Sequence, residues 1–112
     1  EFFNLNNLIK NILKNLFPKI HSKIKVKDLD LFVRGELKKY NLEKYFNHAL
    51  GHGVGLEIHQ APRISKYSNE LLSENMIIAI EPGIYFPDKF GIRIENDYLV
   101  TSEKTICLTN FK

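Results

Sequence analysis

The stretch from His48 to His59 constrains this chain most, because it holds three of the four histidines within twelve residues. Imidazole is the commonest side-chain metal ligand and an acid or base near neutral pH. The glycines between the histidines are Gly51, Gly53 and Gly55. Glycine lets the backbone adopt positive φ or approach a ligand closely. His52 and His59 are seven residues apart, so one unbroken strand would point them to opposite faces. A break at the glycines would bring both to one site; the alternative is a glycine-rich turn with solvent-exposed histidines.

Two later segments each place a carboxylate within an apolar, strand-like run. Glu81 lies in the sequence IEPG, where strand alternation puts it on the face of Ala79 and Gly83. Glu95 lies in the sequence RIEN and shares a face with Arg93. A carboxylate among apolar neighbours is costly unless it is paired or bound to a cation. The alternative for the second segment is a local ion pair between Arg93 and Glu95, which would contribute less than about 1 kcal/mol.

Composition narrows the class of protein. A chain of 112 residues with 44% apolar and 26% charged residues suits one small, soluble globular domain. The net charge of +3 comes from scattered lysines, whereas a nucleic-acid surface needs clustered ones. No stretch approaches the roughly 18 apolar residues of a membrane span. The single cysteine, Cys107, cannot form an internal disulfide, so we expect a reducing, cytoplasmic location. Because Glu1 is no natural start, we expect a part of a longer protein.

The first third of the chain predicts two amphipathic helices. Apolar residues recur at three- and four-residue steps from Leu5 to Phe17, with Asn4 as N-cap and Pro18 ending the helix. A second helix is predicted from about Val26 to Tyr40. Its expected buried face comprises Val26, Leu29, Val33, Leu37 and Tyr40. Asp28 and Asp30 are expected in its first turn, where the helix dipole favours negative charge, and Asn41 in the left-handed cap.

The remainder reads as strands joined by loops. Residues 61–65 are expected to form a loop, and Asn75 a turn with positive φ. The predicted strands are Met76–Phe86, Gly91–Thr101 and Lys104–Leu108. Their short connections favour hairpins and therefore an antiparallel sheet. The predicted fold class is α+β.

Three blocks together resemble a known family. Residues 48–65 (HALGHGVGLEIHQAPRIS), 81–85 (EPGIY) and 91–101 (GIRIENDYLVT) are closely similar to the Xaa-Pro dipeptidase (prolidase) and aminopeptidase P family of dinuclear metallopeptidases. The resemblance is dense over the last two thirds of the chain and loose before that. It implies that residues 1–112 are the C-terminal half of a pita-bread catalytic domain, with two helices packed on a curved antiparallel sheet.

The resemblance also implies the metal site. His52 matches an imidazole ligand, Glu81 a terminal carboxylate on the same metal, and Glu95 the carboxylate that bridges two metals. Such a mixed ligand set suits Mn²⁺ first, with Co²⁺, Zn²⁺ and Fe²⁺ as alternatives. The family takes two further aspartate ligands from an upstream half, and Asp28 and Asp30 do not match them. The chain therefore supplies three of five ligands, and we expect it to be inactive in isolation.

Catalytic roles follow from the same matches. Glu81 would shuttle a proton to the leaving proline nitrogen. His48 and His59 would hold the substrate and stabilise the tetrahedral intermediate, and Arg93 would order the site. The implied partners are a proline-containing peptide, the missing N-terminal half and further copies of the protein, with neither nucleic acid nor membrane among them.

Two rival functions remain at this point. Methionine aminopeptidase shares the fold, but the sequences Glu-Pro-Gly and Arg-Ile-Glu point away from it. A non-catalytic pita-bread module that binds peptides or proteins would tend to lose metal ligands, whereas His52, Glu81 and Glu95 are all present.

Overall fold

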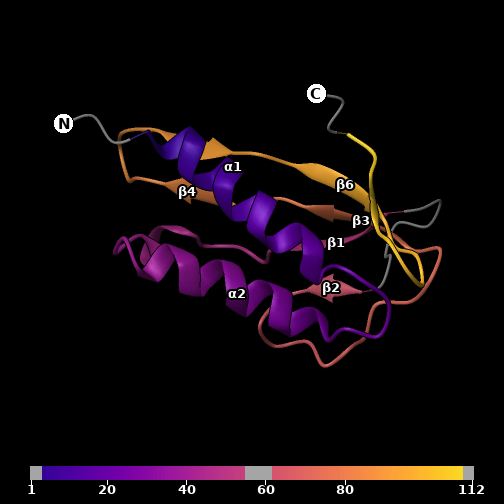
Figure 1. Cartoon of the computed structure of the whole chain (residues 1–112). Helices are drawn as coiled ribbons and strands as arrows, with labels where there is room; N and C mark the ends of the chain where they lie inside the picture. The colour runs from indigo at the N-terminus through magenta and orange to yellow at the C-terminus, as the bar shows by residue number, and fades with distance from the viewer. Residues whose placement is uncertain (1–3, 55–61, 110–112) are drawn as a thin grey trace.

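A computed structural model describes residues 4–54 and 62–109 (Figure 1). The helices are α1 (Leu5–Leu16) and α2 (Val26–Lys38), with 3-10 turns η1 (Phe17–Lys19) and η2 (Glu43–Tyr45). The strands are β1 (Gly51–Val54), β2 (Arg63–Ile64), β3 (Ile77–Ile80), β4 (Gly83–Tyr85), β5 (Gly91–Arg93), β6 (Asn96–Leu99) and β7 (Ile106–Cys107). The two helices lie side by side over the sheet, which confirms the α+β class. Over the described ranges, no helix has the length and apolar character needed to cross a membrane.

Helix α1 forms as predicted. The Asn4 side chain accepts a hydrogen bond from the Asn7 backbone N–H at 3.1 Å, which satisfies one of the free donors at the helix start. The apolar stripe is buried at Leu8, Ile9, Ile12, Leu13 and Leu16. Pro18 lies in the 3-10 turn that ends the helix. The stripe therefore forms core.

Helix α2 departs from prediction at two residues. It ends at Lys38, and Tyr40 is 51% exposed, so the prediction that Tyr40 belongs to the buried face is wrong. Asn41 has φ 61°, as expected of a left-handed cap. Asp28 lies in the first turn, but Asp30 lies in the second and is fully buried. Burial gives Asp30 a structural function that the helix dipole does not explain.

Five strands form one antiparallel sheet in the order β2-β1-β3-β6-β7, and β4 and β5 form a separate hairpin. The predicted strand Met76–Phe86 is two strands, broken at Glu81 and Pro82, because proline has no N–H to donate to a ladder. The predicted strand Gly91–Thr101 is also two strands, broken at residues 94 and 95. Part of the predicted loop at residues 61–65 is edge strand β2.

The two faces of the sheet differ. Ile78, Ile80 and Tyr98 on one face are buried in the core that the helices cover. The ring centroids of Tyr98 and Phe17 lie 5.6 Å apart, and burial raises the pKa of Tyr98 to about 12, so the phenol stays neutral. The opposite face is called the site face below. It carries one apolar row across four strands, comprising Val54, Ile77, Leu99 and Ile106.

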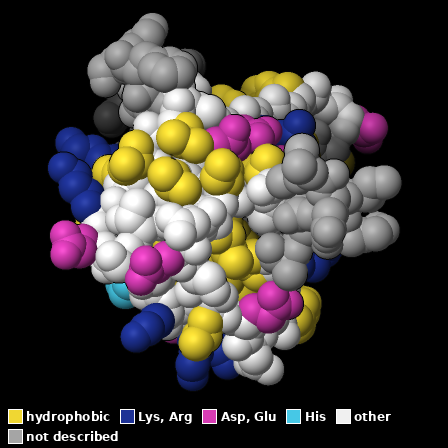
Figure 2. All heavy atoms as spheres, turned by 90° about the vertical axis from the view of Figure 1, so that its right-hand side faces the viewer, with side chains coloured by type: hydrophobic (Ala, Val, Ile, Leu, Met, Phe, Trp, Pro, Cys, Tyr) yellow, Lys and Arg dark blue, Asp and Glu magenta, His cyan; other side chains and the backbone are white. Residues whose placement is uncertain are grey.

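The apolar row is only partly covered within the described chain. Val54 is 41% exposed and Ile106 is 48% exposed, while Ile77 and Leu99 are half-buried. Figure 2 shows that hydrophobic side chains gather at one end of the molecule, with acidic side chains beside them. Exposed apolar patches of this kind mark surfaces that another segment or molecule covers.

Gly51 serves close strand packing. It pairs with Ile80 and Ile64 inside β1, and the described glycines all have negative φ, so the expected break at the glycines does not occur at Gly51 or Gly53. A Cβ added at Gly51 would lie 1.9 Å from the Ala79 carbonyl oxygen. Backbone atoms cannot rotate away, so only glycine fits.

We expect Gly51→Ala to lower the free energy of unfolding by about 3 kcal/mol, since overpacking against backbone forces β1 and β3 apart. Gly35→Ala is the matched control, because nothing lies within 4 Å of a Cβ at this position in α2. Alanine should stabilise the helix there by about 0.5–1 kcal/mol. Urea unfolding followed by circular dichroism measures both changes. Equal effects of the two substitutions would contradict the close-packing argument.

Candidate metal centre

The site face carries a polar row beside the apolar one. His52 on β1 pairs with Ala79 on β3, and Ala79 pairs with Asp97 on β6. Directly opposed residues of antiparallel strands point to the same face. His52 and Asp97 therefore flank the small Ala79 side chain from either side. On the outer strand, Arg63 pairs with His52 and extends the row.

Glu81 and Glu95 face each other where the ladder is interrupted. Ile80 pairs with Asn96 before the break, and Gly83 pairs with Arg93 after it. The register is the same on both sides, so it places Glu81 opposite Glu95. Like charges directly opposed in a ladder are destabilising, with Cβ atoms only about 4.5–5.5 Å apart. This arrangement therefore favours a cation between the two strands.

His52 presents the nitrogen that a metal requires. Its Nδ1 lies 2.9 Å from the Gly53 carbonyl oxygen, which can only accept, so Nδ1 carries a proton; in the neutral imidazole Nε2 then has the lone pair. Nε2 lies 3.3 Å from Glu81 Oε2. Two donor atoms about 2.1 Å from one metal ion at a tetrahedral angle lie about 3.4 Å apart. The separation of His52 and Glu81 therefore fits two ligands of one ion.

Arg93 holds the other oxygen of Glu81. Its guanidinium lies 3.7 Å from Glu81 Oε1, and the arginine side chain is half exposed. Among the described residues, the ion pair formed by Arg93 is with Glu81 and not with Glu95, so the alternative of a local Arg93–Glu95 pair is wrong. Each carboxylate oxygen of Glu81 therefore has a neighbouring side chain, His52 at Oε2 and Arg93 at Oε1.

The electrostatic environment of Glu95 confirms that the acidic side chains are close. The pKa of Glu95 is raised, first by burial and then by the negative charges of Asp97 and Glu81, and His52 opposes the rise.

Among the described residues, no three histidine, cysteine, aspartate or glutamate side chains lie close enough together to hold a metal ion by themselves. His59 lies outside the described residues.

His48 occupies a more enclosed position than His52. Its Nδ1 lies 2.7 Å from the Ala49 carbonyl oxygen, which fixes the proton on Nδ1. Its ring packs edge-on against Phe46 at 4.9 Å and against Tyr85 at 5.5 Å. Nε2 is buried without a hydrogen-bond partner among the described residues. A buried, unpaired nitrogen is costly, so this atom is available to a ligand.

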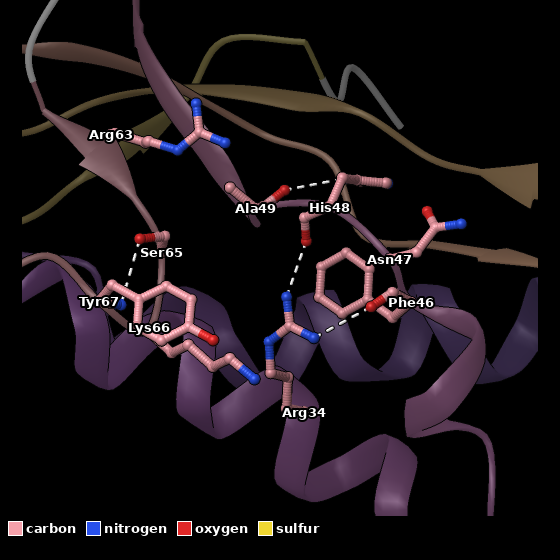
Figure 3. A pocket seen from close by; sticks show the side chains of 9 residues that line it. All are labelled: Arg34, Phe46, Asn47, His48, Ala49, Arg63, Ser65, Lys66 and Tyr67. Carbon is pink, nitrogen blue, oxygen red and sulfur yellow. Dashed lines mark hydrogen bonds between the residues drawn. The ribbon is translucent and has the colours of Figure 1, made fainter.

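A buried ion pair on α2 positions this segment. Arg34 lies 2.5 Å from Asp30, and donates to the Phe46 carbonyl at 3.0 Å and the His48 carbonyl at 2.8 Å (Figure 3). The other oxygen of Asp30 accepts from the Leu50 N–H at 3.1 Å. The side chain of Asp30 is fully buried and that of Arg34 is 11% exposed. The pair therefore fixes the backbone on both sides of His48.

A cavity of about 330 Å³ lies beside this segment (Figure 3). His48, Arg63, Lys66 and Tyr67 are among its lining residues, and the charged groups on it are cationic. Asp30 already pairs with Arg34, and among the described residues Arg63 and Lys66 form no ion pair, so they supply the positive charge of the cavity. The cavity suits an anionic or electron-rich group.

Sequence reasoning missed three residues of this face. Asp97 follows Glu95 by two positions, so strand alternation could have placed it beside the acid. Tyr85 follows Glu81 by four positions and shares its face by the same rule, and a Cβ at Gly83 or Gly91 would collide with its ring. Arg63 gave no signal, because the strand that holds it has only two residues.

Comparison with known proteins agrees with this geometry. Residues 3–102 match metallopeptidase family M24. The chain belongs to this family. A protein named Xaa-Pro dipeptidase from Pyrococcus horikoshii is 49% identical over 86 residues, which are 77% of this chain and 24% of that protein.

Solved structures of the family superimpose on the chain. The prolidase from Pyrococcus horikoshii has a TM-score of 0.87 at 40% identity, and covers 95% of this chain and 30% of its own length. The X-Pro aminopeptidase from Thermotoga maritima has a TM-score of 0.87 at 33% identity over the same shares, 95% and 30%. The expected half of a pita-bread fold is confirmed. The chain spans about a quarter of the curated Xaa-Pro dipeptidases that it matches, 24% in each.

We expect Asp30→Ala to lower the free energy of unfolding by about 3–5 kcal/mol, because it leaves Arg34 buried without its partner. Amide exchange at Leu50 should accelerate, since its N–H loses its acceptor. Glu36→Gln is the control: it removes an acid of the same helix whose pair with Lys39 lies at the surface, and should change stability too little to measure. A small effect of Asp30→Ala on both measurements would exclude this anchoring.

We expect the metal-free protein to lose stability as the pH rises above 4.5, the ordinary pKa of the Glu95 carboxyl. The folded state raises this pKa, so it binds the proton more tightly than the unfolded chain, and that contribution disappears as Glu95 ionises. Glu95→Gln should remove this part of the pH dependence. Urea unfolding of both proteins in chelator at a series of pH values tests the difference. Parallel curves would contradict the raised pKa.

Proposed function

We propose that this chain is part of an Xaa-Pro metallopeptidase that hydrolyses the peptide bond before proline. The observation that carries the proposal is the opposition of Glu81 and Glu95 next to Nε2 of His52, which lies 3.3 Å from Glu81 Oε2. These are the donor types that Mn²⁺, Co²⁺, Zn²⁺ and Fe²⁺ accept. The names of the prolidase and X-Pro aminopeptidase relatives support the substrate.

The donor set of the chain fits a divalent metal centre. His52 and Glu81 would hold one ion, and Glu95 would bridge to a second. The chemistry that two divalent ions supply when bound is polarisation of the scissile carbonyl and a lower pKa of water. Two further carboxylates would come from sequence outside residues 1–112, from the other half of the domain. Mn²⁺ is the first candidate.

The neighbouring residues of the chain would act on protons and on the substrate. Glu81, oriented by Arg93 at 3.7 Å, would carry a proton to the leaving proline nitrogen. Nε2 of His48 would accept a hydrogen bond from a substrate N–H, because Nδ1 already holds the proton. Donation from His48 to an oxyanion would require the imidazolium form. His59 would supply the oxyanion donor.

The wider setting follows from the same proposal. The substrate is a proline-containing peptide, and the location is the cytoplasm. The exposed apolar row on the site face would be covered by the other half of the domain. In the complete protein we also expect association into homo-oligomers.

We expect Glu95→Ala to abolish metal-dependent cleavage of Xaa-Pro peptides in the complete gene product, because it removes the bridging charge. His59→Ala should retain the metal and lose about 10²–10³ in rate, the usual cost of one oxyanion donor. Kinetics with Mn²⁺ and metal analysis of the same samples test both. If the wild type binds metal but cleaves no Xaa-Pro peptide, the proposed activity is wrong and the chain belongs to a binding module. If His59→Ala loses the metal, His59 is a metal ligand and not an oxyanion donor.

A further inference from the structure

Asp97 is an acidic residue whose backbone is held by hydrogen bonds and whose side-chain Oδ1 has no hydrogen-bond partner in the described chain. Its N–H donates to Thr109 Oγ1 at 2.9 Å, and its carbonyl accepts from the Leu108 N–H at 2.7 Å. The backbone therefore cannot turn the side chain away from the site face. Oδ1 is buried and has no hydrogen-bond partner among the described residues. A buried acceptor without a donor is costly and calls for an explanation.

The position of Asp97 in a cluster of acidic side chains supplies an explanation for its unpaired oxygen. It lies across Ala79 from His52, and the pair Glu81 and Glu95 occupies the next row of the same face. The negative charges of Asp97 and Glu81 both raise the pKa of Glu95, which places the three carboxylates within electrostatic reach of one another. Three acidic side chains thus surround a methyl group, and within the described ranges the ion pairs in this cluster involve only Glu81.

The negative charge exceeds what the neighbouring cations neutralise. Arg93 pairs with Glu81, and no arginine or lysine of the described chain lies within ion-pair distance of Glu95 or Asp97. Like-charged carboxylates directly opposed across a strand pair are unfavourable, and a cation between them removes the repulsion. Groups that hold a metal ligand in place commonly lie directly behind it, and their loss costs about 10–100-fold in metal affinity.

We propose that Asp97 supports the metal centre electrostatically: its carboxylate lies on the same face as His52, Glu81 and Glu95 and adds a negative charge that strengthens cation binding. This inference rests on the proposed function, because it assumes that His52, Glu81 and Glu95 bind metal. It assigns no direct metal contact to Asp97. It also explains why a protein tolerates two adjacent carboxylates that destabilise each other in the metal-free state.

The test uses the complete gene product and Mn²⁺ alone. We expect Asp97→Asn, measured by calorimetry, to weaken Mn²⁺ binding about 10–100-fold. Glu103→Gln is the control, since it removes the same charge from an exposed residue between β6 and β7, and should leave the affinity unchanged. Asp97→Glu keeps the charge but displaces the carboxylate, so its affinity should fall between those of wild type and Asp97→Asn.

Thermal unfolding in chelator separates an electrostatic role of Asp97 at the metal centre from a purely structural role. In the metal-free state, Asp97→Asn should unfold at the same temperature as wild type or higher, because it removes the repulsion with Glu95. Mn²⁺ should then raise its unfolding temperature less than that of wild type. A lower metal-free unfolding temperature with unchanged Mn²⁺ affinity would overturn the proposal.

The same measurements distinguish failure of this inference from failure of the proposed function. If wild type binds Mn²⁺, His52→Ala abolishes binding and Asp97→Asn binds as tightly as wild type, only the role of Asp97 is wrong. If wild type binds no Mn²⁺, or if binding survives His52→Ala, the assignment of the metal centre is wrong, and the role proposed for Asp97 is then wrong as well.

Discussion

The buried ion pair between Asp30 and Arg34 connects the helical layer to the site. Its hydrogen bonds end on the backbone at residues 46, 48 and 50, which surround His48 and lead into β1. A buried charge pair is weak evidence of stability, because desolvation offsets the Coulombic gain. Here it specifies one arrangement of a segment that has little regular structure of its own. The position of His52, two residues further on, depends on that arrangement.

The second constraint is the register between the long strand pairs. One register runs through the break at Pro82 and the interruption at Ile94, and it brings two glutamates face to face. A one-residue slip would move both to the core side and expose isoleucines. The apolar core under Ile78 and Ile80 therefore enforces a repulsion on the opposite face. Packing energy from one side of the sheet therefore holds the two carboxylates opposite each other, and a cation bound between them would relieve the repulsion.

Local chemistry made part of this structure predictable. The cap at Asn4 and the positive φ values at Asn41 and Asn75 follow from the residue types alone. The exposure of Tyr40 and the burial of Asp30 do not, because both depend on what packs against α2. Strand parity grouped Glu81 with Ala79, and Glu95 with Arg93, but the opposition of the two glutamates required the register. The break expected at the glycines does not occur at Gly51 or Gly53, since close approach of strands leaves no mark in one sequence.

The two histidines show how one local device gives two chemical roles. In each, Nδ1 donates to the carbonyl of the following residue, so in the neutral imidazole the lone pair is on Nε2. His52 is 53% exposed at the side chain, and its Nε2 faces a carboxylate, which is the environment of a metal ligand. His48 is enclosed by Phe46 and Tyr85, and its Nε2 meets no protein partner in the described chain. The hydrogen bond to the backbone carbonyl places a proton on Nδ1 in both, and the surrounding side chains give the two Nε2 atoms different environments, one beside a carboxylate and the other among aromatic rings.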